Sequence, residues 1–147
     1  MKVLLLNGSP HKNGCTYTAL SEVANSLNEE GIETEIVWVS TKPLMSCTAC
    51  AKCAEKGECA FGKDGVNDFV KKAYDADGFI FGSPVHYAAA TGAITSFLGR
   101  AFYSNSHGAD AEAFKFKPAA MVASARRAGT TATFDQLNKF FGITQMP

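Results

Sequence analysis

Four cysteines that lie close together carry the most specific chemistry in this sequence. Cys47, Cys50, Cys53 and Cys59 follow the order C-x2-C-x2-C-x5-C. Thiolates this close in sequence can hold an iron-sulfur cluster or a zinc ion. Zinc sites usually use two C-x2-C pairs separated by a longer stretch, and bacterial ferredoxins have a shorter last spacing followed by proline. The run therefore leaves two interpretations: a [4Fe-4S] cluster, or four free thiols in a loop at a subunit interface.

A second group of reactive or polar residues forms a loop near the start of the chain. Residues 8–16 read Gly-Ser-Pro-His-Lys-Asn-Gly-Cys-Thr. A loop of small and hydroxyl residues between a strand and a helix can bind a phosphate through backbone amides and the helix N-terminus. The loop has neither the Gly-x-Gly-x-x-Gly pattern nor a Walker A ending, which argues against a dinucleotide fold or an NTPase. Ser9 and Thr16 are also typical of a turn and a helix cap, so the loop alone leaves both interpretations open.

Alternating apolar patterns predict the elements that position these residues. Strands are expected at 3–6, 35–39, 79–81 and 119–123, and helices at 19–27, 66–73, 94–102 and 134–141, the last capped by Thr130 or Thr131. This alternation predicts an α/β fold with a doubly wound parallel sheet. In such sheets ligands bind beyond the carboxyl ends of the strands, where three loops rich in Gly, Ser, Thr or Ala are expected at 7–16, 82–92 and 124–131. A further strand is expected after the last helix, because without one an edge of the sheet stays uncovered.

Composition narrows the classes of function. The chain has 147 residues, with 14 basic and 14 acidic side chains, so it lacks the cationic field that nucleic acids or anionic membranes attract. Its length fits one domain. The apolar run at 3–6 is too short for a signal peptide or a membrane span. We therefore expect a cytoplasmic protein with reduced thiols.

Three sequence segments together resemble the NADPH-dependent FMN reductase family of flavodoxin-like proteins. They are residues 7–16, residues 82–87 (Gly-Ser-Pro-Val-His-Tyr) and residues 124–130 (Ser-Ala-Arg-Arg-Ala-Gly-Thr), and the cysteine run resembles the iron-sulfur flavoprotein branch. The resemblance covers essentially the whole chain. It implies a flavodoxin-like sheet of order 2-1-3-4-5 whose last strand is missing from this chain. It also implies one FMN-binding domain over residues 1–147, with a Cys-rich loop at 44–64.

The resemblance also implies which residues contact FMN. Those expected around the phosphate are Ser9, His11, Asn13, Cys15 and Thr16. Those expected along the isoalloxazine are Pro84, Val85, His86, Tyr87 and Ala88, and those at its pyrimidine edge are Ser124, Ala125, Arg126 and Gly129. Cys15 stands where the family commonly has asparagine, so FMN affinity is expected to be lower than usual. No catalytic side chain is expected, because the flavin carries the chemistry.

These features predict an FMN-dependent oxidoreductase that transfers electrons from NAD(P)H to a flavin, quinone or similar acceptor. An alternative is an iron-sulfur flavoprotein that carries electrons from ferredoxin without pyridine-nucleotide turnover, and a third is a flavin-free interaction domain. An open flavin face needs cover, so we expect a homodimer or homotetramer, with aromatic residues of the segment 102–116 exposed as subunit contacts. The sequence leaves open the physiological acceptor and the choice between NADH and NADPH.

Overall fold

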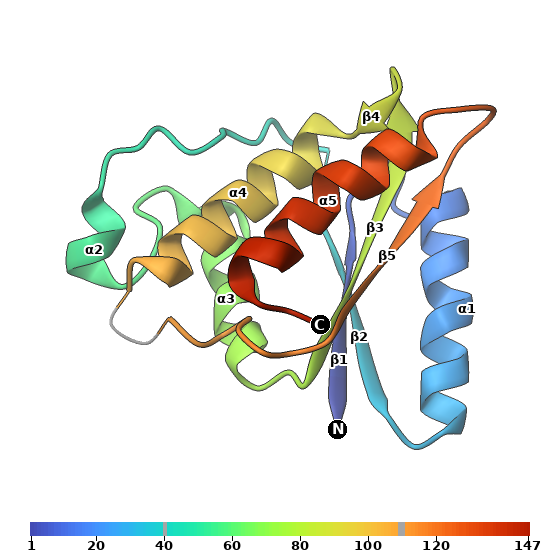
Figure 1. The fold of residues 1–147 in the computed structure, drawn as a ribbon, viewed down its shortest axis with the longest axis horizontal. Coiled ribbons are helices and arrows are strands. Elements are labelled where there is room, and N and C mark those ends of the chain that lie inside the picture. Colours follow the sequence, from blue (N-terminus) through green and yellow to red (C-terminus); the bar gives the residue numbers. More distant parts are fainter. Residues whose placement is uncertain (40, 109–110) are drawn as a thin grey trace.

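The protein folds around a parallel β-sheet with helices on both faces (Figure 1). The computed structural model describes residues 1–39, 41–108 and 111–147. The strands are β1 (Lys2–Asn7), β2 (Glu33–Trp38), β3 (Gly78–His86), β4 (Ala89–Ala90) and β5 (Ala119–Ser124). The parallel strands run in the order β2-β1-β3-β5, and the two-residue β4 pairs antiparallel with the end of β3. The predicted flavodoxin-like α/β fold is confirmed.

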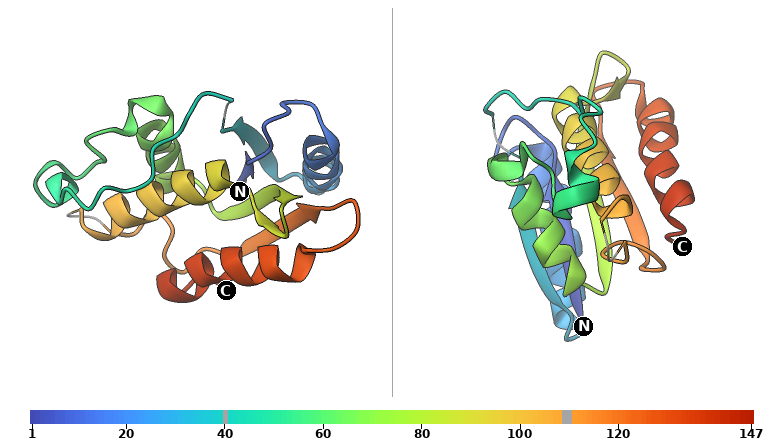
Figure 2. Two further views of the ribbon diagram at one scale, coloured as in Figure 1. Left: turned by 90° about the horizontal axis from the view of Figure 1, so that it is seen from above. Right: turned by 90° about the vertical axis from the view of Figure 1, so that its left-hand side faces the viewer.

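The two faces of the sheet carry different helices. The helices are α1 (Cys15–Glu29), the short α2 (Lys52–Lys56), α3 (Val66–Tyr74), α4 (Gly92–Ser106) and α5 (Thr130–Thr144), with a 3-10 turn η1 at Gly62–Asp64. In the left view of Figure 2, seen from above, α1 lies on one side of the sheet and α3, α4 and α5 lie on the other. Leu4 and Leu6 of β1 pack toward the first group and Leu5 toward α1, and all three are fully buried. The continuous apolar run of β1 thus follows from burial on both faces.

The larger core is rich in aromatic side chains. The rings of Phe102 and Phe114 stack at a centroid distance of 4.2 Å, and Phe114 also lies against Phe79 and Phe69. The prediction that the aromatic residues of segment 102–116 are exposed is therefore wrong for Phe102 and Phe114, whereas Tyr103 and Phe116 are exposed. The sequence pattern missed this because these rings reach the core from the end of α4 and from the segment that returns to β5.

Several local details differ from the sequence prediction. The Cys-rich segment 44–64, expected to be a loop, contains α2 and η1. Neither Thr130 nor Thr131 caps α5, because Gly129 occupies the N-cap position with a φ of 99° and no side-chain cap bond is made. Thr91 does cap α4, since its side chain accepts a hydrogen bond from the Ile94 N–H.

The last residues of the chain lie beside β5. The carbonyl oxygen of Pro147 accepts a hydrogen bond from the Ala119 N–H at 2.9 Å, and Met146 is buried. Over residues 1–39, 41–108 and 111–147, β5 has β3 as its sole strand partner. The segment after α5 therefore contacts β5 at Ala119.

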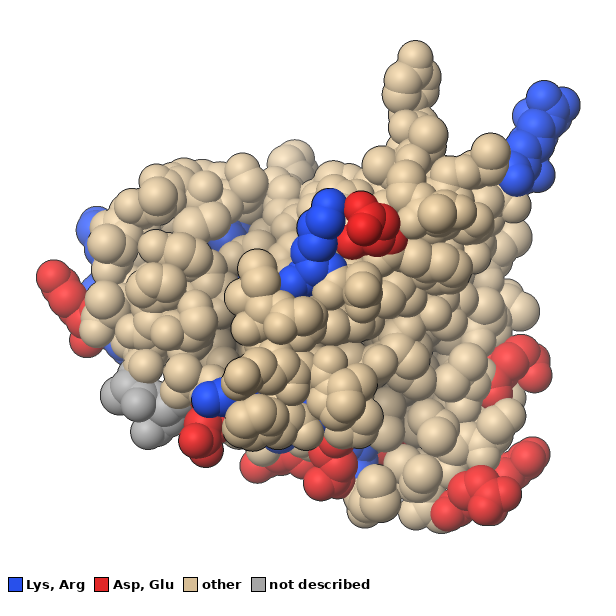
Figure 3. Space-filling model, viewed as in Figure 1, with Lys and Arg blue, Asp and Glu red and all other residues tan. Residues whose placement is uncertain are grey.

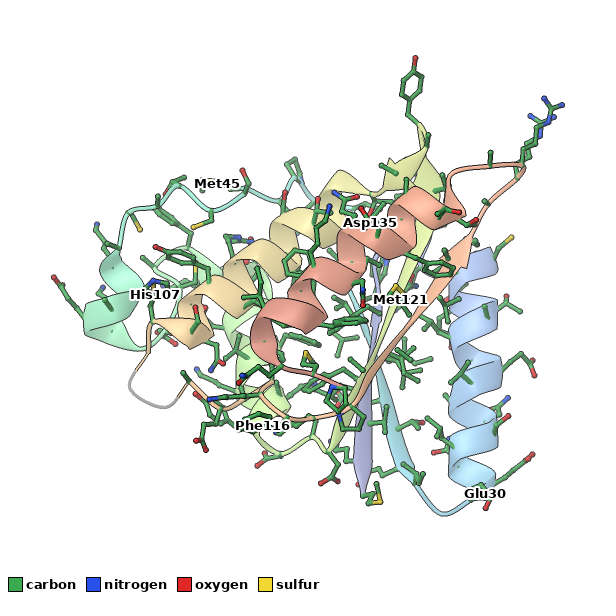
Figure 4. The ribbon with its side chains drawn as sticks, viewed as in Figure 1. Glu30, Met45, His107, Phe116, Met121 and Asp135 are labelled. Atoms are coloured by element: carbon green, nitrogen blue, oxygen red, sulfur yellow. The ribbon has the colours of Figure 1, made fainter. Side chains whose placement is uncertain are left out.

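Charged side chains are scattered over the face shown in Figure 3. Most of this face is uncharged, but a basic and an acidic group lie side by side near its middle, where the Lys139–Asp135 ion pair of α5 is found (Figure 4). In the part of the chain that the structure describes, no helix is both long and apolar enough to cross a membrane.

Candidate functional site

Three loops meet at the carboxyl ends of β1, β3 and β5 and enclose a hollow of about 350 Å³. The loop after β1, the end of β3 and the loop after β5 all contribute to its wall. Its lining residues are Ser9, His11, Gly14, Cys15, Thr16, Pro84, Val85, His86, Ser124, Ala125 and Arg126. Ligands of open parallel sheets bind at this rim. We call this hollow the loop pocket.

The N-terminus of α1 opens into the loop pocket. Its N-cap residue is Gly14, which makes no side-chain cap bond, and the first helical residues Cys15 and Thr16 line the pocket. The first N–H groups of a helix have no partner within the helix, and they lie at the positive end of its dipole. This end of the pocket is therefore suited to a phosphate.

Hydrogen bonds from buried side chains fix the shape of the first loop. The side chain of Asn7, which is fully buried, donates to the Lys12 carbonyl and accepts from the Ser9 N–H, both at 3.0 Å. The Ser9 hydroxyl accepts from the His11 N–H at 3.1 Å, and Trp38 Nε1 donates to the Ser9 carbonyl at 2.8 Å. Asn7 and Trp38 were not predicted as site residues. The position of Asn7 at the end of a buried strand could have marked it as a site residue, whereas no feature of the sequence marked Trp38.

Three further contacts tie the three loops together. The hydroxyls of Thr16 and Ser124 are 2.8 Å apart, which joins α1 to the end of β5. The Thr91 hydroxyl donates to the Gly8 carbonyl at 2.8 Å, and the Thr91 N–H donates to Ser83 Oγ at 3.1 Å. The pocket wall is thus held by side-chain bonds between loops that are distant in sequence, so that little reorganisation is needed on binding.

The turn between β3 and β4 is strained and exposed. Tyr87 and Ala88 both have positive φ, 48° and 66°, a combination that two-residue hairpin turns require and that asparagine and glycine adopt more readily. The Tyr87 side chain is fully exposed.

The lining of the loop pocket brings together all the predicted FMN contacts except Asn13, Tyr87, Ala88 and Gly129, and it adds Gly14.

The four cysteines line a second pocket, which we call the cysteine pocket. Its wall consists of Cys47, Thr48, Cys50, Ala51, Cys53, Cys59, Ala60, Phe61, Arg100, Tyr103 and Ser104. Figure 4 labels Met45 on the coil that leads to this pocket and His107 just after α4. No residue is common to this wall and that of the loop pocket. The two groups of residues singled out in the sequence therefore form two separate sites.

The cysteines are held to different degrees. Cys53 is buried within α2, and the backbone of Cys59 is fixed by Asn67, which accepts from its N–H at 3.1 Å and donates to its carbonyl at 2.9 Å. Cys47 and Cys50 are exposed on the coil before α2. Cys53 and Cys59 therefore lie against the body of the protein, and Cys47 and Cys50 lie on its surface.

The coil between the first cysteines has features that suit a cluster. The Ala49 N–H donates to Cys47 Sγ at 3.5 Å, and Ala49 and Ala51 have φ values of 53° and 58°. Left-handed residues in such a coil turn successive N–H groups inward, as in many Fe–S sites. The free space is about 20 Å³, room for one water, so a cluster fits only when the exposed coil moves outward. Across the described residues, no three or more His, Cys, Asp or Glu side chains converge on a single metal ion.

Comparison with known proteins assigns the family. The profile described as NADPH-dependent FMN reductase matches residues 1–147. The chain belongs to this family. An iron-sulfur flavoprotein of Methanocaldococcus jannaschii is 33% identical over 152 residues, which cover 99% of this chain and 74% of that protein. One of Archaeoglobus fulgidus is 33% identical over 100 residues, which cover 68% of this chain and 45% of that protein.

Solved structures of flavoproteins share the fold. RosB with a bound riboflavin-phosphate intermediate has a TM-score of 0.75 at 17% identity, over all of this chain and 61% of that one. FerB, an NAD(P)H:(acceptor) oxidoreductase from Paracoccus denitrificans, has a TM-score of 0.68 at 17% identity, over 97% of this chain and 71% of that one. The family match confirms the predicted family membership and FMN as the predicted cofactor.

In this member of the family, Gly129 has a structural role at the loop pocket. A Cβ at this position would lie 2.6 Å from Val85 Cγ1 and 2.8 Å from Ala88 Cα, and its φ of 99° strains any other residue. We expect Gly129→Ala to lower the free energy of unfolding by about 3 kcal/mol, from backbone strain and overpacking. We also expect it to weaken FMN binding, because Val85 lines the pocket. Urea unfolding and flavin fluorescence titration measure the two effects.

The matched control is Gly142→Ala in α5. A Cβ there meets no atom within 4 Å, so the change should stabilise the helix by up to about 1 kcal/mol. A Gly129→Ala variant as stable as the unmodified protein, and with the same FMN affinity, would contradict the packing argument.

Proposed function

We propose that this flavoprotein takes electrons from NAD(P)H and passes them to a flavin, quinone or similar acceptor. The observation that carries the proposal is the loop pocket, which combines an uncapped helix N-terminus with accessible backbone from three loops. FerB is named an NAD(P)H:(acceptor) oxidoreductase, and a second structural neighbour, EmoB, is an NADH:FMN oxidoreductase with a TM-score of 0.66 at 20% identity. Their names support the same reaction class.

In this proposal each loop binds a different part of FMN. The phosphate lies at the N-terminus of α1, near His11 and Thr16. Pro84, Val85 and His86 lie along the ring, and the loop after β5 meets the pyrimidine edge. FMN supplies the hydride-accepting and electron-passing chemistry, so the protein needs no acid or base of its own. The residues of the protein bind and orient FMN.

The two arginines after β5 are suited to charge on the ligands. Arg126 lines the loop pocket and Arg127 follows it, and both are exposed. A guanidinium forms paired hydrogen bonds with oxyanions, so Arg126 would offset negative charge at the pyrimidine edge or meet a nucleotide phosphate. Neighbouring side chains diverge, so only one of the two serves the pocket.

The second candidate function is electron transfer through a cluster, without pyridine-nucleotide turnover. It is favoured by the cysteine pocket, in which four thiols share one wall, and by curated relatives that are named iron-sulfur flavoproteins. The thiols of Cys47, Cys50, Cys53 and Cys59 would hold a [4Fe-4S] group that exchanges single electrons with a ferredoxin. This proposal and the first share FMN and differ in the electron donor.

Anaerobic reduction separates the two candidates. We expect NADH or NADPH to bleach the flavin absorbance of the FMN-loaded protein and to sustain turnover with a quinone, at rates well above those of free FMN under the same conditions. If neither nucleotide reduces the bound flavin while reduced ferredoxin does, the electron-carrier function is correct. We also propose that residues 1–147 act as a single FMN-binding domain. The homodimer or homotetramer stays a prediction, and small-angle scattering of the same sample tests it.

A further inference from the structure

A buried arginine forms part of the wall of the cysteine pocket. Arg100 of α4 lines this pocket together with the four cysteines, although its side chain is only 1% exposed. Arginine is rarely buried to this extent without pairing, because removal of a charge from water costs several kcal/mol. Its place beside the cysteines therefore needs a physical reason.

The guanidinium of Arg100 is held in one orientation by hydrogen bonds from its two terminal nitrogens. One terminal nitrogen donates to the Phe61 carbonyl at 3.0 Å, and the other pairs with Asp64 at 2.5 Å. Its Nε is buried without a hydrogen-bond partner among the described residues. An unpaired buried donor costs about 1–3 kcal/mol, so a nearby acceptor that appears on ligand binding would remove this cost.

The charges around the pocket are arranged asymmetrically. Asp64, the counter-charge, is part of η1 and does not line the cysteine pocket, whereas Arg100 does. The other lining side chains, those of Thr48, Phe61, Tyr103 and Ser104 and two alanines, carry no charge. The positive end of the ion pair therefore borders a space otherwise walled by thiols and uncharged groups.

We propose that Arg100 tunes the group held by Cys47, Cys50, Cys53 and Cys59, by donating its free Nε–H to sulfur and by favouring the more negative, reduced state. This inference rests on the proposed cluster site. A cluster held there would gain one electron from reduced ferredoxin, with no bond formed or broken, so a fixed positive charge and a donor to sulfur would favour its reduced state. Arg100 is thus a positioning residue that sets the reduction potential. It does not ligate the cluster.

The test uses two variants, one that removes the positive charge of the ion pair and one that removes its negative charge. The full-length chain is reconstituted anaerobically with iron and sulfide, its iron is counted, and its cluster is titrated with dithionite and followed by EPR. Arg100→Gln should lower the equilibrium constant for reduction at least tenfold, which corresponds to about 59 mV for a one-electron couple. Asp64→Asn removes the counter-charge and should shift the potential upward. The potential of bound FMN should stay unchanged in both variants.

Two control variants isolate the charge effect. Ser104→Ala alters the same pocket without changing charge, because the Ser104 hydroxyl donates to the Ala101 carbonyl within α4. Glu33→Gln removes an exposed carboxylate that pairs with Lys2 at the start of β2. Neither should shift the cluster potential. A perturbation of structure alone would shift the Arg100 and Asp64 variants in the same direction.

Each outcome decides the inference. Opposite shifts in the two variants support it. About four irons per chain, with potentials that are unchanged or that move together, overturn it and leave the cluster proposal intact. If Arg100→Gln does not fold, Asp64→Asn decides alone: an upward shift supports the inference and no shift overturns it. Unmodified protein that takes up no iron overturns the cluster and this inference together, while NAD(P)H reduction of its FMN still tests the first proposed function.

Discussion

Replacing Cys15 with aspartate should weaken FMN binding about 100-fold. Cys15 is exposed, is the first residue of α1 and lines the loop pocket, so a carboxylate there would face the proposed phosphate position. At about 5 Å and an effective dielectric constant of about 40, a phosphate near its second ionisation is repelled by about 3 kcal/mol. Quenching of flavin fluorescence on binding measures the dissociation constant.

The substitution is designed to leave the fold intact. A negative charge in the first turn of a helix stabilises it by about 0.3–1 kcal/mol, so the free energy of unfolding should not fall. Riboflavin, which lacks the phosphate, should bind the variant and the unmodified protein equally. If the aspartate weakens the binding of riboflavin as much as that of FMN, the pocket itself has been damaged. If the affinity for FMN is unchanged, the phosphate does not lie at the N-terminus of α1.

Asparagine at the same position provides a matched comparison. It has the shape of aspartate without the charge, and its amide can donate a hydrogen bond to a phosphate. A net gain of about 1 kcal/mol per hydrogen bond predicts roughly fivefold tighter FMN binding for Cys15→Asn. The order of affinity should therefore be asparagine, then cysteine, then aspartate. This order would bear out the expectation that cysteine at this position gives lower FMN affinity than the family's common asparagine.

The fold and the loop pocket were predictable because their signals are local. The apolar run at Leu4–Leu6 is buried on both faces, as a central parallel strand requires, and the loops that follow the parallel strands must meet at one rim. Most of the predicted FMN contacts line one pocket for this reason. Tyr87 does not, because the hairpin turn that carries it is set by pairing of β3 with β4, and Tyr-Ala is not a typical sequence for such a turn.

The features that escaped prediction depend on contacts distant in sequence. Helix α2 has no apolar periodicity, so nothing in its five residues distinguishes it from a loop. Arg100 falls on a predicted helix, where an arginine is expected to face solvent, and only the approach of Phe61 and Asp64 shows it to be buried and paired. The stacking of Phe114 on Phe102 likewise depends on how the chain returns from α4 to β5. Local pattern does not contain this information.

Replacing Cys59 with serine should abolish iron binding. After anaerobic reconstitution we expect about four irons per chain in the unmodified protein and close to none in the variant, because a [4Fe-4S] cluster needs all four thiolates and a serine hydroxyl does not replace one. The backbone of Cys59 stays fixed by Asn67, so the loop should keep its position in the variant. Colorimetric iron analysis and the visible absorbance of the cluster measure the loss.

Cys15→Ser is the matched control, because Cys15 is the one cysteine outside the cysteine pocket. It should keep full iron content, whereas full iron in Cys59→Ser would contradict ligation by this residue.

Thermal stability provides an independent measurement of the same site. A group that binds only the folded state stabilises it by mass action, and this one would link the coil of Cys47 and Cys50 to α2 and to Cys59. Removal of iron by a chelator should therefore lower the melting temperature of the unmodified protein to that of Cys59→Ser, and should leave the variant unchanged.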